Sequence, residues 1–293
     1  MVTGGSSNAQ TVAVAESGLA VAELMLMNPD QRQRWRTDGS IYQIDYAASK
    51  VRVQLRSETG KVDINSADQR LLQALMVQAP VEAKLQTSLV NAILDWRDAD
   101  DLVRIEGAEK EEYKDAGLSY RPGNRPFQSV EELQLVLGMN EQVFNWLESL
   151  VTVHSGLPKV DLTQAAKEVL LVLPDMDAEL IDDYIAARRE SAINGLPVPA
   201  FGANAASLSG ADMPETAVNN GTEPTGMITV VTEAQLDDGT TAMIKALIKR
   251  SDTGWSPFQG LKWQRSAALD ASLFTDEKDQ LLVRQYAEPE FNN

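Results

Sequence analysis

The stretch IYQIDYAASKVRVQL, residues 41–55, decides the fold of the first part of this chain. Apolar and polar side chains alternate on both sides of a small break at 47–49, which is the pattern of two strands joined by a tight turn. Ahead of it, residues 11–36 carry apolar residues at helical spacing, and Asn28-Pro29 predicts a break or kink. A helix followed by a strand hairpin therefore opens the chain.

Beyond residue 61 the apolar period becomes helical and stays so to about residue 190. The polar capping residues predict six helices: from Asn65 or Ser66 to Met76, Val81–Trp96, Val130–Leu137 with Ser129 and Glu132 as a capping box, Asn140 to near Val153, Asp161 or Thr163 to Val172, and Asp177 to Glu190.

After residue 226 the alternation returns, with strands predicted at Met227–Thr232, Thr240–Lys249 and Trp255–Gln264 and a weakly patterned tail at 266–293. Because strands flank the helical block, the fold class is α+β: an N-terminal helix on an antiparallel sheet, with a large all-α insert that contains helical hairpins. The predicted parts are 11–60 (helix and strands), 61–190 (insert), 191–226 (flexible linker or loop) and 227–293 (second strand segment).

Composition excludes several classes of function. There are 43 acids against 26 bases, so a net charge of -17 disfavours nucleic-acid backbones and anionic membranes and suits cations or basic partners. No cysteine and one histidine exclude disulfides, thiolate sites and multi-histidine metal sites. No stretch looks long and apolar enough to span a bilayer, and residues 1–10 show no leader, so we expect an N-terminal truncation.

The segment between Asp95 and Asp115 concentrates nine acids against four bases. Such crowding costs Coulomb repulsion unless a cation binds, and calcium takes six to eight oxygen ligands. Asp98 and Asp100 point the same way if the loop is extended, while Asp95 lies one helical turn earlier and Gly107 permits a bend that returns Glu109. The spacing is not that of an EF-hand, and charge alone equally predicts a solvated acidic loop.

A second pattern is an internal repeat: VDINSA at 62–67 and VDLTQA at 160–165, each followed by a helix. This predicts a short helical hairpin used twice, similar to helix-hairpin-helix units that bind DNA in many proteins. The hairpin turns near 79–82 and 174–177 are acidic or neutral, which argues against DNA and for a structural role.

Several of these segments together resemble one family. ILDWRDADD at 93–101, Gly107 to Tyr113, PFQSVEEL at 126–133 and AARR at 186–189, with the two Val-Asp caps, resemble the type II secretion minor pseudopilin of the K type over roughly 10–265.

The resemblance implies a non-enzymatic, pilin-like subunit at the pseudopilus tip, where it initiates assembly and supports secretion of folded proteins. It implies I-type and J-type minor pseudopilins as partners, contact with secreted substrates, and a periplasmic location with an inner-membrane anchor. It also favours calcium in the acidic loop, with these ligands: Asp95, Asp98, Asp100 and Glu109, and as further candidates Asp101 and Glu106. Two alternatives stay open: a calcium-dependent hydrolase that uses the acidic-loop carboxylates, and a helical-hairpin DNA-binding protein.

Overall fold

The structure is a computed structural model that describes residues 3–202, 217–218, 226–251, 256–266 and 271–287. The helices are α1 (Thr3–Leu26), α2 (Gln69–Gln78), α3 (Ala83–Arg97), α4 (Lys110–Asp115), α5 (Glu141–Leu147), α6 (Lys167–Val172), α7 (Ala178–Ile193) and α8 (Asp276–Asp279), with 3-10 segments η1 (Glu58–Gly60) and η2 (Val130–Leu135). The strands are β1 (Asp38–Tyr46), β2 (Ser49–Ser57), β3 (Val62–Asp63), β4 (Val151–Thr152), β5 (Val160–Asp161), β6 (Ala217–Val218), β7 (Met227–Leu236), β8 (Thr241–Arg250), β9 (Phe258–Ser266) and β10 (Leu282–Ala287).

The main sheet has the strand order β10-β1-β2-β7-β8-β9. Its hairpins are those that the alternation predicts: Tyr46 pairs with Ser49 across a two-residue turn, and β7 turns into β8 at 237–240. The mixed α+β class is confirmed. One edge differs from the prediction, because β10, in the tail that looked weakly patterned, adds parallel to β1. That pairing joins residues about 240 apart, so no local pattern announces it.

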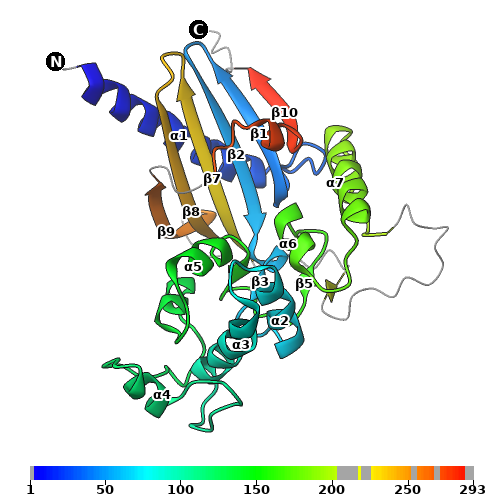
Figure 1. Cartoon of the computed structure of the whole chain (residues 1–293). Helices are drawn as coiled ribbons and strands as arrows, with labels where there is room; N and C mark the ends of the chain where they lie inside the picture. The colour runs from blue at the N-terminus through cyan, green and yellow to red at the C-terminus, as the bar shows by residue number, and fades with distance from the viewer. Residues whose placement is uncertain (1–2, 203–216, 219–225, 252–255, 267–270, 288–293) are drawn as a thin grey trace.

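Helix α1 lies across the sheet against β2, β7 and β8 (Figure 1). Its close approach requires Gly18, since a Cβ there would lie 2.7 Å from Cγ1 of Val51. The helix ends at Leu26, before Asn28-Pro29, so the break is confirmed and the predicted extension to residue 36 is wrong. The expectation that no segment suits a membrane was also too strict: Asn8–Leu26 is long and apolar enough by composition, with a mean hydropathy of 1.2.

The chain leaves the sheet after β2 and returns to it at β7, the strand that pairs with β2. The residues between them form α2 to α7 and surround their own hydrophobic core, which includes Leu72, Ile93 and Leu162. A separate core, which includes Val53 and Val230, lies between α1 and the sheet. Figure 1 shows the helical block at one end of the sheet, with α4 at its far end.

The repeated Val-Asp motif does something other than cap a helix. In each copy it forms a two-residue strand, β3 or β5, and the aspartate then accepts bonds in a turn. Asp63 accepts from the Asn65 amide at 2.8 Å, and Asp161 accepts from the Thr163 amide at 2.9 Å. The predicted starts of α2 and α6 are therefore several residues early, because the motif occupies that stretch.

Three further predictions need correction. Helix α5 begins after its predicted cap, Asn140, but ends at Leu147 because the chain then enters β4. The segment after Ser129 is a 3-10 helix whose cap side chain makes no capping bond. Of the predicted linker 191–226, the first residues belong to α7, and 203–216 and 219–225 lie outside the described residues.

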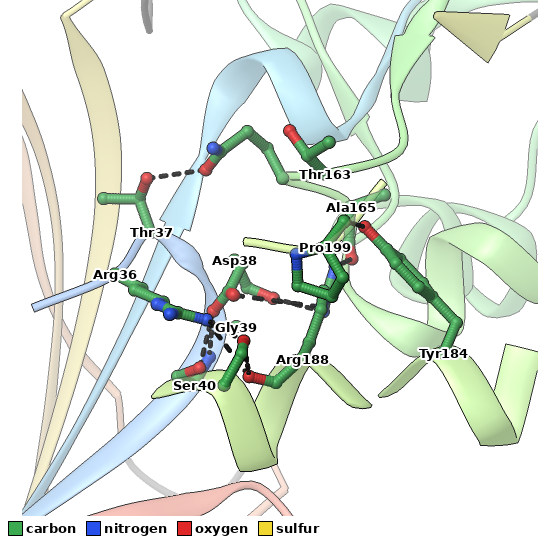
Figure 2. Close-up of polar contacts among 12 residues, drawn as sticks. Arg36, Thr37, Asp38, Gly39, Ser40, Thr163, Ala165, Tyr184, Arg188 and Pro199 are labelled. Atoms are coloured by element: carbon green, nitrogen blue, oxygen red, sulfur yellow. Dashed lines mark hydrogen bonds and ion pairs between the residues drawn. The ribbon is translucent and has the colours of Figure 1, made fainter. Parts of the chain in front are cut away.

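Buried polar contacts fasten the helical block to the sheet. Arg188 of α7 donates to the Ala165 carbonyl at 2.6 Å and to the Asp38 carbonyl of β1 at 2.7 Å (Figure 2). Its Nε lies 3.8 Å from the Asp38 carboxylate, and both side chains are buried. Arg36 donates in turn to the Arg188 carbonyl and to Ser191. An arginine with this many carbonyl partners fixes the orientation of the block on the sheet.

A second junction lies at the end of β2. Glu58 is buried and accepts from Lys61 at 2.7 Å, from Thr229 of β7 at 2.6 Å, and from Thr152 of β4. Burial raises the pKa of Glu58, but the charge of Lys61 and these hydrogen bonds outweigh it and leave the pKa below its usual value. Glu58 is therefore an ionised acid whose charge is balanced by a base of the same chain.

Candidate functional site in the acidic loop

The acidic loop, residues 98–109, begins where α3 ends. The last turns of α3 are buried, which places Asp95 fully inside the protein. Arg97 closes the helix by donating to the carbonyls of Ile64 and Ala67. The helix end is thus fixed to the motif that precedes α2, and the loop starts from a rigid point.

Asp95 organises the loop from below. One carboxylate oxygen accepts from the Arg104 amide at 3.2 Å and from the Ala108 amide at 2.9 Å. The other accepts from the Arg104 guanidinium at 2.6 Å. A buried carboxylate requires such partners, so the side chain predicted as a ligand also shapes the backbone of the loop.

Asp98 converges on the same guanidinium, since Arg104 Nη1 also donates to its Oδ2. The expectation that Asp95 and Asp98 reach one centre therefore agrees with the geometry, with an arginine nitrogen between them. The second oxygen of Asp98 is buried and has no hydrogen-bond partner in the described part of the chain. The hydrogen bonds that the Arg104 guanidinium donates to Asp98 and Asp95 raise its pKa.

Glu109 carries the most unusual environment in the loop. The residue is buried, and neither carboxylate oxygen has a hydrogen-bond partner among the described residues. Burial raises its pKa to about 7, and the charges of Asp95 and Asp98, with those of Asp101 and Asp100, add to the effect. Glu109 is thus an acid that faces other acids and has no base as a hydrogen-bond partner in the described part of the chain.

The other predicted residues lie farther out. The exposed Asp100 side chain accepts from the Leu102 amide at 2.9 Å, and its charge contributes to the raised pKa of Glu109. Asp101 accepts from Asn124 at 2.8 Å, and the Asn124 amide also reaches the Asp100 carbonyl. Glu106 is exposed and holds a left-handed backbone, with φ at 59°.

Gly107 is required for a steric reason. A Cβ there would lie 2.0 Å from Oδ2 of Asp95, far inside contact distance. The left-handed residue that bends the chain is Glu106, so the prediction that Gly107 supplies the bend misplaced it by one position. The glycine instead lets the backbone close over a buried carboxylate.

Two residues of this site went unnoticed in the sequence. Arg104 was counted only as a base, although it is the single base between Asp98 and Glu109. Asn124 offers a buried side-chain oxygen without a partner in the described residues, and it reaches the loop from 23 positions beyond Asp101. Throughout the described ranges, no three acidic or histidine side chains are close enough to hold a metal ion with the side chains as they stand.

Comparison with known protein families finds one that matches the part of the chain that contains the acidic loop. Residues 52–156, from β2 through the acidic loop to β4, match the family model for "Type II secretion system (T2SS), protein K". Over these residues the chain is similar to the type II secretion protein K family. The match spans the region in which the helical block leaves the sheet and includes every predicted ligand of the acidic loop.

A solved structure agrees with the K family fold. The chain resembles one in the crystal structure of the GspK-GspI-GspJ complex from the enterotoxigenic Escherichia coli type 2 secretion system, with a TM-score of 0.56 and 16% identity. The likeness covers 89% of this chain and 97% of that one, so it extends over both the sheet and the helical block. No curated protein sequence matches the chain.

Proposed function

We propose that this chain is a non-enzymatic minor pseudopilin of the type II secretion system that sits at the tip of the pseudopilus and starts its assembly. The family match over residues 52–156 carries the proposal. The fold is consistent with it, because a long apolar helix packed on a sheet is paired with a helical block that lies outside both.

The position of the helical block favours the tip. The block, which comprises α2 to α7, projects from one end of the sheet, as Figure 1 shows. In a filament of stacked subunits, such a block would collide with a subunit placed above it. A place at the end of the filament avoids that collision.

The exposed face of α1 suits helical partners. Ala13, Ala20 and Leu24 of α1 and Met27 directly after it are exposed and lie at spacings of seven, four and three residues, which form one apolar stripe. The similar structure contains GspI and GspJ beside GspK. We therefore expect I-type and J-type minor pseudopilins to pack along α1, with the periplasmic part anchored in the inner membrane through the N-terminal helix.

Co-purification tests this assignment. The chain, co-expressed with the I-type and J-type pseudopilins of the same organism, should form a complex with both. A variant with Ala20→Glu and Leu24→Glu should lose the complex, because charges interrupt the apolar stripe. Val77→Glu, an exposed aliphatic position on α2, is the matched control and should keep it. A parent chain that remains monomeric beside both proteins would contradict the proposal.

We also propose that the acidic loop binds calcium. Buried oxygens without partners in the described residues occur at Glu109, Asp98 and Asn124, and Asp95 is already oriented by backbone amides. Carboxylate, amide and carbonyl oxygens are the ligands that calcium prefers, and six to eight are needed. Arg104 lies between two of the acids and 38% of its side chain is exposed, so we expect its guanidinium to turn outward when a divalent ion takes its place.

The ion would act as a structural staple, because it joins the end of α3 to the start of α4. Isothermal titration with calcium should give saturable heat with the parent chain and none with Asp98→Ala. Asp100→Ala should weaken binding less, since that side chain is exposed and already accepts from the Leu102 amide. Glu109→Gln should abolish binding, whereas Glu111→Gln, an exposed acid paired with Lys114, should not. Absence of heat with the parent chain would refute the site.

A further inference from the structure

In the loop segment 102–105 the apolar side chains are exposed and the charged side chain points inward, which is the reverse of an ordinary surface loop. Leu102, Val103 and Ile105 expose 77%, 49% and 87% of their surface. The charged residue among them, Arg104, points inward to the two carboxylates described above. Single exposed aliphatic side chains are common on protein surfaces, but three within four residues concentrate apolar surface in one short segment, which is typical of an interaction site.

This aliphatic patch, formed by Leu102, Val103 and Ile105, is held in place by its backbone. The Leu102 amide donates to Asp100 at 2.9 Å, and the Ile105 carbonyl accepts from the Asn91 side chain at 2.8 Å. The backbone amide of Arg104 donates to the buried carboxylate of Asp95. None of these three bonds involves the Arg104 guanidinium, so the exposure is a feature of the ordered loop backbone and does not require that guanidinium to point inward. A surface fixed in one conformation loses little entropy when a partner binds.

The surroundings of the patch define its partner. Asp100, Asp101 and Glu106 are exposed next to it, on a chain with a net charge of -17. This acidic border opposes an anionic membrane and opposes a second copy of the same patch. It complements a protein surface in which lysine or arginine surrounds an apolar groove.

We infer that the aliphatic patch docks into an apolar groove, bordered by basic residues, on a protein other than the subunits that pack along α1. The loop lies at the end of the helical block away from the sheet and from the N-terminus of α1 (Figure 1), so both surfaces can be occupied together. The inference goes beyond the proposed tip assignment, and only its secretion readout rests on that assignment.

Secretion in the organism of origin tests the patch in the full-length protein. Changing all three patch residues to serine should lower the secretion of type II substrates by about tenfold, because a docking surface that loses its apolar contacts loses at least that much affinity. The matched control replaces three exposed aliphatic residues elsewhere on the block, through Val77→Ser, Leu85→Ser and Leu135→Ser, and should secrete at the parent level. Both variants should still co-purify with the I-type and J-type pseudopilins.

A photoreactive benzoyl-phenylalanine in place of Val103 identifies what covers the patch. The expected adduct joins a protein other than the I-type and J-type pseudopilins, at an apolar peptide next to lysine or arginine. Parent-level secretion by the triple-serine variant would overturn the inference, as would an adduct with either pseudopilin or with lipid. Loss of co-purification in that variant would also overturn it. If the parent chain itself fails to co-purify, the tip assignment fails, while the adduct still reports on the patch.

Discussion

Two buried glutamates at opposite ends of the helical block show how differently this chain treats its acids. Glu58, where the block meets the sheet, contacts Lys61 and two threonine hydroxyls, and its pKa is lowered. Glu109, in the acidic loop at the far end, contacts no donor in the described residues, and its pKa is raised to about 7. Both residues are about equally buried, with exposed fractions of 3% and 5%.

The different partners of Glu58 and Glu109 indicate different roles: Glu58 joins the helical block to the sheet, and Glu109 belongs to the proposed calcium site. A buried carboxylate costs several kcal/mol unless it is paired, and of these two glutamates only Glu58 has a base of the described chain as its partner. In the acidic loop the chain supplies oxygens and one half-exposed arginine. The junction therefore needs no added ion, whereas we expect the loop to gain stability when it binds a cation.

The largest effect is expected where the pair is complete. Lys61→Met leaves Glu58 as an unpaired buried charge and should lower the free energy of unfolding by about 3–5 kcal/mol. Urea unfolding measures the loss. The double variant Glu58→Gln/Lys61→Met removes both charges and should recover most of it. A single variant as stable as the parent would show that Glu58 is not held as an ion.

Calcium should produce the next largest effect, and only in the loop. At a free concentration one hundred times the dissociation constant, it should stabilise the parent by about 2.7 kcal/mol, because it binds the folded state alone. Glu109→Gln should lose this increment, and Glu58→Gln should keep it, each measured by thermal unfolding with calcium and with a chelator. If calcium stabilised the two variants equally, Glu109 would contribute no more to calcium binding than Glu58, which would contradict the proposed difference between them.

Gly107→Ala should be intermediate. Its Cβ would meet Oδ2 of Asp95 at 2.0 Å, so the loop must shift, at a cost of about 1–3 kcal/mol. The control is Gly260→Ala, where a Cβ meets nothing within 4 Å. Denaturant unfolding compares the two variants. If the two variants were equally stable, the loop would be able to shift at no cost, and Asp95 would not be fixed beneath it.

The smallest effect concerns a third acid, Glu168, which lies between Arg56 and Lys278. Burial raises its pKa, but the two bases outweigh burial and lower the pKa to about 2. The stability that it contributes is present above its ordinary pKa of 4.5 and is lost as the pH falls through about 2. Because the side chain is partly exposed, the contribution is about 1 kcal/mol or less. Unfolding of Lys278→Met between pH 5 and pH 2 should show a smaller pH dependence than the parent.

The sheet could be predicted from the sequence because its information is local. Alternation in 41–55 and the Asp237-Asp238-Gly239 turn each fix a hairpin between neighbouring strands. β10 could not be predicted, since its partner β1 lies far away in the chain and its own pattern is weak. The Val-Asp repeat could be recognised as a motif, but the amino-acid sequence alone does not distinguish its short strand and turn from a helix cap.

In the acidic loop, too, some features could be predicted from the sequence and others could not. The concentration of acids and the convergence of Asp95 with Asp98 follow from composition and helical spacing. The inward turn of Arg104 and the approach of Asn124 depend on the three-dimensional path of the loop. The exposure of the aliphatic patch has the same origin, because a sequence pattern would place the apolar residues inside and the arginine outside.

A crystal structure of the protein grown with calcium tests the contrast between the two ends most directly. The account predicts an ion about 2.3–2.6 Å from oxygens of Asp95, Asp98 and Glu109, with the Arg104 guanidinium turned outward. The Glu58–Lys61 pair should be unchanged in the same crystal. A loop in which Arg104 still bridges Asp95 and Asp98, and in which Glu109 still lacks a partner at saturating calcium, would contradict the account.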